Sequence, residues 1–232
     1  EQQNKTQAKQ EELIIGTDNY PPYTYIADDG KVMGIDIELA REAAQRMHMK
    51  PVFKMLNWEE KDKLLEKGDI DCIWSCFSLN NRENVYDWAG PYLASRHVIV
   101  VPRRSTVHKI SDLEGRRLVV QSGTQPEKIF LERKRSDVPQ LHDLYCTNDV
   151  DVLFASLQLG YADATACNEI VAQQYAHKFP GDFTILSDVL LETKLGVAFA
   201  KGKNQDKVKK LDEVLKEMQQ DGTIEEVVAK YT

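Results

Sequence analysis

The chain has 232 residues, of which 42% are hydrophobic and 29% are charged, and its formal net charge is −7. This composition is ordinary for a globular protein that is long enough for one large domain or for two compact lobes. The negative charge argues against a nucleic-acid-binding protein, and no apolar run approaches the roughly 20 residues that a membrane-spanning helix needs.

The N-terminal segment is polar. Its sequence, EQQNKTQAKQ, contains a single alanine and no apolar core of the kind that a signal peptide carries. We therefore expect residues 1–10 to form a disordered tether, which is compatible with a leader having been removed before residue 1.

The next part of the chain alternates between strand and helix patterns. A strand is predicted at 13–17, a turn at Asp28-Asp29-Gly30, and a helix after Asp36, which is placed as its N-cap. Further expected elements are strands at 51–55 and 71–74 and a helix at 58–66 that ends near Gly68.

The alternation starts afresh after Val101 and finishes near Leu195, and further elements are expected before it and up to the C-terminus. Strands are expected at 98–101, 117–121, 163–166, 183–186 and 195–200, and helices from Pro126, at 149–159, at 169–177, at 205–219 and at 224–231. This order predicts an α/β fold with mostly parallel sheets. We expect one lobe from residues 11–97 and 196–232, a second, inserted lobe from residues 98–195, and two crossings between them.

The cysteines give no sign of a metal site. Cys72, Cys76, Cys146 and Cys167 form neither a CxxC pair nor a Cys/His pattern. We expect four free thiols, no bound metal and no cofactor.

Five groups of motifs follow one another along the chain. They are Gly16-Thr-Asp18-Asn-Tyr20-Pro-Pro22-Tyr23 with Gly34-Ile-Asp36, Gly68-Asp-Ile-Asp71 with Ser78-Leu-Asn-Asn-Arg82, Ser111-Asp-Leu113 with Gln121-Ser-Gly123-Thr124, Gly160-Tyr-Ala-Asp163, and Leu195-Gly196-Val-Ala-Phe199. Together they resemble the periplasmic amino-acid-binding proteins of ABC transporters, the type 2 solute-binding proteins of bacterial family 3. The resemblance implies two α/β lobes joined by two hinge crossings.

The resemblance also implies a function. It predicts an extracytoplasmic monomer that closes on a small polar amino acid and delivers it to an ABC transporter permease, with no nucleic-acid partner. A lipid anchor before residue 1 would add peripheral membrane association. Two alternatives remain open: the sensing module of a membrane receptor, and an enzyme similar to cyclohexadienyl dehydratase, which would act on prephenate or arogenate.

Arg82 is predicted to grip the ligand's carboxylate. Its planar guanidinium can form two parallel charge-assisted hydrogen bonds, and Ser78 can add a hydroxyl donor. The gap between these two residues is one residue shorter than is usual in the family. The alternative is that Arg82 pairs with Glu83, Asp87 or another acidic residue at the surface. Cys76 belongs to the same predicted site.

The start of the helix after Gly123 is predicted to complete the carboxylate site from the second lobe. Free N–H groups at a helix start attract anions, although Thr124 could equally act as a plain N-cap. A ligand bound to both Arg82 and Thr124 would favour the closed state. Gln121 and Gln125 offer further polar groups.

The remaining predicted contacts surround the ligand side chain. Tyr20 and Trp58 resemble the aromatic residues that flank the ligand in the family, and Asp18 can bond a polar ligand group. The alternatives are core or staple packing for Trp58 and an Asx-turn for Asp18. These contacts favour glutamine, arginine, histidine or a similar amino acid.

Asn168 departs from the family pattern. The family usually places an acidic residue here to bind the ligand's ammonium, whereas this chain has Asn168 followed by Glu169. An amide accepts a hydrogen bond but brings no charge. Four explanations remain open: weaker binding, a replacement by Glu169, a ligand without a conventional α-ammonium, or a site altered by engineering or drift.

Overall fold

A computed structural model describes residues 8–232, so residues 1–7 of the tether predicted at 1–10 lie outside the described residues. Eight strands form one continuous sheet in the order β4-β1-β5-β10-β6-β9-β7-β8. Their bounds are β1 Glu12–Thr17, β4 Lys50–Met55, β5 Cys72–Ile73, β6 Asp87–Pro102, β7 Arg117–Gln121, β8 Asp143–Thr147, β9 Ala164–Asn168 and β10 Phe183–Phe199. A small separate hairpin contains β2 Tyr25–Ile26 and β3 Val32–Met33.

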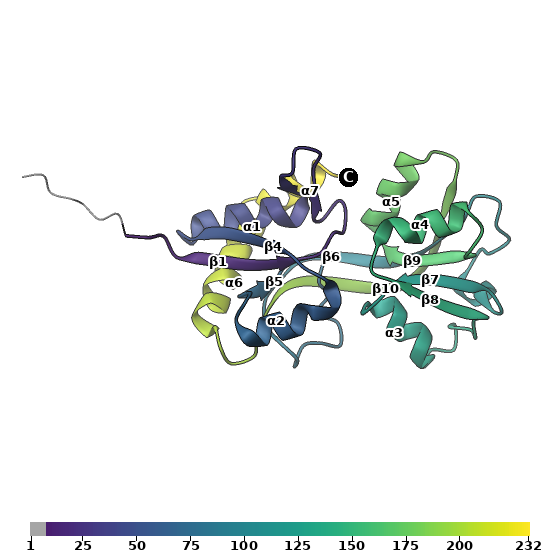
Figure 1. The fold of residues 1–232 in the computed structure, drawn as a ribbon, viewed down its shortest axis with the longest axis horizontal. Helices are drawn as coiled ribbons and strands as arrows, with labels where there is room; N and C mark the ends of the chain where they lie inside the picture. Colours follow the sequence, from purple (N-terminus) through teal and green to yellow (C-terminus); the bar gives the residue numbers. More distant parts are fainter. Residues whose placement is uncertain (1–7) are drawn as a thin grey trace, which may run out of the picture.

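Helices cover both faces of the sheet, which confirms the predicted α/β architecture (Figure 1). In Figure 1, α1 lies above the sheet and α2 below it in one half, and α4 and α5 lie above it and α3 below it in the other. The helices are α1 Ile35–Arg46, α2 Lys61–Lys67, α3 Gln125–Glu132, α4 Val150–Gln158, α5 Glu169–Lys178, α6 Gln205–Gln220 and α7 Thr223–Ala229, with short 3₁₀ turns at Trp58–Glu60 and Ile110–Leu113.

The two longest strands, β6 and β10, run from one half of the molecule to the other (Figure 1). They pair antiparallel along most of their length. The sequence predicted only pieces of them, at 98–101, 183–186 and 195–200, because polar residues interrupt the apolar pattern where the strands cross between the halves. Parallel pairing occurs within each half, between β1 and its neighbours β4 and β5 and between β7 and its neighbours β8 and β9.

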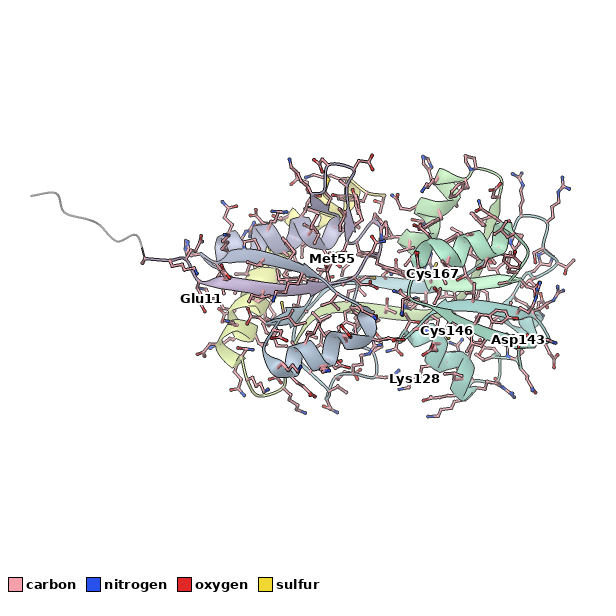
Figure 2. The ribbon with its side chains drawn as sticks, viewed as in Figure 1. Glu11, Met55, Lys128, Asp143, Cys146 and Cys167 are labelled. Carbon is pink, nitrogen blue, oxygen red and sulfur yellow. The ribbon has the colours of Figure 1, made fainter. Side chains whose placement is uncertain are left out.

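The carboxyl ends of the parallel strands face the middle of the molecule. Met55 at the end of β4 and Cys146 on β8 lie toward the centre. Glu11, just before β1, and Asp143, the first residue of β8, lie toward opposite ends (Figure 2). Because ligands in open α/β sheets bind outside the carboxyl ends of the strands, this arrangement places a candidate site between the halves.

The prediction that Asp36 caps a helix was wrong. The N-cap of α1 is Gly34, and Asp36 lies inside the first turn with 1% of its surface exposed. Its carboxylate accepts hydrogen bonds from the Cys76 N–H at 2.6 Å and from the Tyr92 hydroxyl at 2.5 Å. A long-range partner of this kind leaves no local signal in the sequence. All four cysteines are free thiols, as predicted.

Candidate functional site

A cavity lies where residues 18–97 face residues 121–125. Its volume is about 40 Å³, which is room for about three water molecules at about 10–15 Å³ each. A free amino acid is larger, so binding requires the halves to separate or the lining side chains to move. The cavity brings together all but one of the predicted site residues, namely Asp18, Tyr20, Trp58, Cys76, Ser78, Arg82, Gln121, Thr124 and Gln125.

The segment after β5 forms one wall of the cavity. Cys76 adopts a left-handed conformation with φ of 47°, which is uncommon for a residue with a side chain. Its N–H is fixed by the Asp36 carboxylate, and burial raises the pKa of Asp36 to about 6. The chain then turns so that Ser75 and Phe77, on either side of Cys76, also line the cavity.

Arg82 is half-buried beside this wall. Its guanidinium carbon lies 4.7 Å from the centre of the Phe77 ring, and its nitrogens donate to the carbonyls of Ser78 at 2.9 Å and Gly123 at 3.4 Å. Within residues 8–232, no carboxylate lies within 4.0 Å of Arg82, so the surface ion pair with Glu83 or Asp87 is not formed. Burial lowers the pKa of Arg82 because the charged form loses hydration.

The start of α3 faces Arg82 from the other half. Thr124 has the extended backbone of an N-cap, but its hydroxyl donates to the Gln121 carbonyl at 2.7 Å and makes no cap hydrogen bond. The positive end of the helix is therefore not neutralised by its own cap residue. Gln125 reaches across the cavity and donates to the Asn80 carbonyl at 2.5 Å.

Asp18 makes another bridge between the halves. Its carboxylate accepts hydrogen bonds from the Gln121 side-chain amide at 2.6 Å and from the Asn19 N–H at 2.8 Å. Burial raises the pKa of Asp18 to about 6, against the opposing effect of these two bonds. The bond to Gln121 means that Asp18 does more than stabilise the local turn.

Aromatic side chains close the cavity. Trp58 and Phe77 pack edge to face with ring centres 5.2 Å apart, so Trp58 serves the core as well as the cavity. Gly123, in the second half, lies close to the Trp58 ring. A Cβ built on this glycine would be 3.5 Å from the ring. Tyr20 is 9% exposed, and its hydroxyl accepts a hydrogen bond from the Asn168 N–H at 3.1 Å.

Asn168 itself does not line the cavity. It is fully buried and caps α5 by accepting from the Ile170 N–H at 3.0 Å. Its amide oxygen also accepts from the Tyr23 hydroxyl at 3.2 Å, and its amide nitrogen donates to Ser95 at 2.9 Å. Both ends of the amide are therefore engaged within the protein.

Glu169 is engaged as well. Its carboxylate pairs with Arg96 through hydrogen bonds of 2.5 Å and 2.9 Å. The two oxygens are held at the surface by the two guanidinium nitrogens. This pairing argues against Glu169 as the substitute for the missing acidic residue.

Sequence reasoning missed three residues of the cavity. Ser75 and Phe77 flank Cys76 and could have been included, because the whole segment follows a strand that ends at the site. His97 is the third, and it lies on β6 outside every motif. No local signal marks it.

Among residues 8–232, none of the helices is long and apolar enough to cross a membrane. No group of three or more His, Cys, Asp or Glu side chains in this part of the chain could hold a metal ion.

Residues 13–232 match the model of the bacterial extracellular solute-binding proteins, family 3, and the chain belongs to this family. The L-cystine-binding protein TcyJ of Escherichia coli (strain K12) is 26% identical over 223 residues, which cover 94% of this chain and 82% of TcyJ.

Two solved structures extend the comparison. An ancestral arginine-binding protein bound to glutamine has a TM-score of 0.85 at 25% identity, covering 96% of this chain and 98% of that one. The ancestral amino acid-binding protein AncCDT-1, a precursor of cyclohexadienyl dehydratase, has a TM-score of 0.85 at 25% identity, with 94% of each chain covered. The predicted type 2 fold and the predicted class of solute-binding protein are confirmed.

Proposed function

We propose that the chain binds one free polar amino acid between its two halves, outside the cytoplasm, and delivers it to the permease of an ABC transporter. The observation that carries this proposal is Arg82, a half-buried cation that lines the cavity and has no acidic partner within residues 8–232. The similar proteins support the ligand class, since TcyJ is named for L-cystine and one ancestral protein is bound to glutamine.

In this proposal the carboxylate of the amino acid lies between Arg82 and the start of α3. Arg82 supplies two parallel donors, and Thr124 and Gln125 bring the positive end of a helix from the opposite half. Cys76 and Ser78 complete the wall beside the carboxylate. A ligand that contacts both halves stabilises the closed state by its greater affinity for that state.

The ligand side chain lies toward Asp18, Gln121, Tyr20 and Trp58. The first two residues bond each other in this structure and can exchange that bond for bonds to a polar ligand group. The two rings supply flat apolar surface. This combination favours arginine, glutamine or histidine over small aliphatic amino acids.

The halves act as two lobes. Residues 11–97 and 196–232 form the first, residues 98–195 form the second, and β6 and β10 are the hinge strands. The protein works as a monomer, and a lipid anchor before residue 1 would hold it at the membrane surface.

A thermal-shift screen against the common L-amino acids tests the proposal. A ligand that binds only the folded state stabilises it by about 2.7 kcal/mol at 100 times its Kd, which is readily seen as a rise in Tm. We expect a polar amino acid to give the largest rise, and no turnover of prephenate or arogenate. A screen in which no amino acid raises the Tm would contradict the proposal.

A further inference from the structure

His97 lines the cavity but takes part in none of the contacts described above. It lies on β6, opposite Leu191 of β10 on one side and Asn168 of β9 on the other. Because β6 pairs with a strand on each side, the backbone of His97 is held in place where the two halves join.

The Nδ1 atom of His97 is buried and has no hydrogen-bond partner within residues 8–232. It is the one such side-chain atom, in that part of the chain, that belongs to a residue of the cavity. The Asp18 carboxylate accepts from Gln121, and the Ser78 hydroxyl is bonded to Asn80. Because buried polar atoms in folded proteins are nearly always paired, an unpaired one beside a binding cavity indicates a partner on the ligand.

The imidazole of His97 is neutral at pH 7. Burial lowers its pKa to about 4; the backbone of Cys167 opposes this shift, and the charge of Arg82 adds to it. A neutral imidazole has one donor and one acceptor nitrogen, so Nδ1 is an acceptor when the proton is on Nε2. Such an acceptor suits a cationic N–H donor.

We propose that Nδ1 of His97 accepts a hydrogen bond from the α-ammonium of the bound amino acid. This inference rests on the proposed function, in which Arg82 holds the carboxylate. In an amino acid the ammonium is one carbon away from the carboxylate, and His97 is close enough to Arg82 to feel its charge. The two residues at the position where the resemblance implies an ammonium ligand are engaged elsewhere, Asn168 as the cap of α5 and Glu169 in its pair with Arg96.

The test compares an amino acid with its counterpart that lacks the α-amino group. Calorimetry measures the binding of L-glutamine and glutaramic acid, and of L-arginine and δ-guanidinovaleric acid, to the wild type and to His97→Leu. We expect His97→Leu to weaken binding of the amino acid by about 10- to 100-fold, the range for a hydrogen bond to a charged group. Binding of the counterpart should change by less than about threefold.

Two further variants separate the role of Nδ1 from packing. His97→Asn keeps a polar atom near the position of Nδ1, whereas His97→Gln places one near Nε2. We expect the Asn variant to bind the amino acid within about threefold of the wild type and the Gln variant to resemble His97→Leu. If His97→Leu does not fold, the comparison of His97→Asn with His97→Gln still tests the role of Nδ1.

The outcomes distinguish this inference from the proposed function. If the wild type binds neither amino acid nor any other in the screen, the proposed function fails and the inference with it. If the wild type binds and Arg82→Ala abolishes binding, but His97→Leu leaves affinity unchanged or weakens both compounds equally, the inference alone is overturned.

Discussion

Asp18 is a carboxylate that lines the cavity and is partly shielded from solvent. Its pKa is raised to about 6, mainly because the charged form loses hydration, even though Gln121 and Asn19 donate to it. The folded state therefore binds a proton more tightly than the unfolded state does. This contribution to stability is fully present below pH 4 and is lost as the pH rises through about 6.

The variant Asp18→Asn should be more stable than the wild type at pH 7, because it no longer buries an ionised carboxylate. We expect a gain of about 1–2 kcal/mol, allowing for partial solvent exposure, and a difference that shrinks toward pH 4. Urea unfolding of the ligand-free protein at several pH values measures this. The control Asp28→Asn, on an exposed loop, should stay within about 0.5 kcal/mol of the wild type throughout. A wild-type-like pH profile for Asp18→Asn would refute the account.

Single residues of the site differ in how well the sequence predicts them. Arg82 and Thr124 lie in motifs with local turn and helix signals, and both line the cavity. Asn168 was predicted to stand where the family usually has an acidic ligand residue, but its side chain caps a helix and bonds Tyr23 and Ser95. These partners come from distant parts of the chain, so the local sequence does not indicate them. No local pattern indicates His97 either, because it reaches the cavity only when β6 pairs between β9 and β10.

At the scale of elements, the start of α1 shows why Asp36 was misplaced. The carbonyls of Pro22 and Tyr23 accept from the N–H groups of Ile35 and Asp36, both at 2.9 Å. Backbone carbonyls thus satisfy these groups, and no carboxylate cap is required. This arrangement needs a close approach at Gly34, where a Cβ would lie 2.3 Å from the Tyr23 carbonyl oxygen.

We therefore expect Gly34→Ala to destabilise the protein by at least about 3 kcal/mol, since both the clash and the positive φ act on rigid backbone. Gly30→Ala is the matched control, because Gly30 also has positive φ but open space around its Cβ. It should cost only about 1–2 kcal/mol. Urea denaturation curves measure the free energy of unfolding of both variants. Equal losses of stability would show that the clash with the Tyr23 carbonyl adds nothing to the cost of the substitution.

The pattern of strands was predicted where apolar residues run without interruption. β1, β4 and β7 lie at or within one residue of the expected positions. β8 was missed, and its sequence, DLYCT, has no buried face: all five residues are half-buried or exposed. The length of β6 and β10 was missed because a strand that connects two cores carries solvent-exposed residues along its middle.

At the scale of the whole molecule, hydrogen bonds hold the halves together beside the cavity. Gln121 donates to Asp18, Gln125 to Asn80, Arg82 to Gly123, and the Asn168 N–H to the Tyr20 hydroxyl. Because the cavity between the halves is only about 40 Å³ and these contacts bound it, the structure represents a closed state of the protein. Periodicity in the sequence predicts two alternating α/β segments but cannot predict how far apart they stand.

Opening and closing should be visible in solution. We expect a saturating amino acid from the screen to decrease the radius of gyration in small-angle X-ray scattering, because the ligand adds contacts that only the closed state makes. Arg82→Ala at the same ligand concentration should show no decrease. A wild-type radius that is the same with and without ligand would argue against hinge closure.

The most direct test of the account is calorimetric titration of Arg82→Ala with the amino acid that the wild type binds. Arg41→Ala is the matched control, because Arg41 also stacks on an aromatic ring, 5.1 Å from the centre of Phe53, but lies outside the cavity. We predict that Arg82→Ala loses at least about 100-fold in affinity, since the buried carboxylate would lose its charged partner, and that Arg41→Ala binds like the wild type. Near-normal affinity in folded Arg82→Ala would contradict the assignment of the carboxylate site.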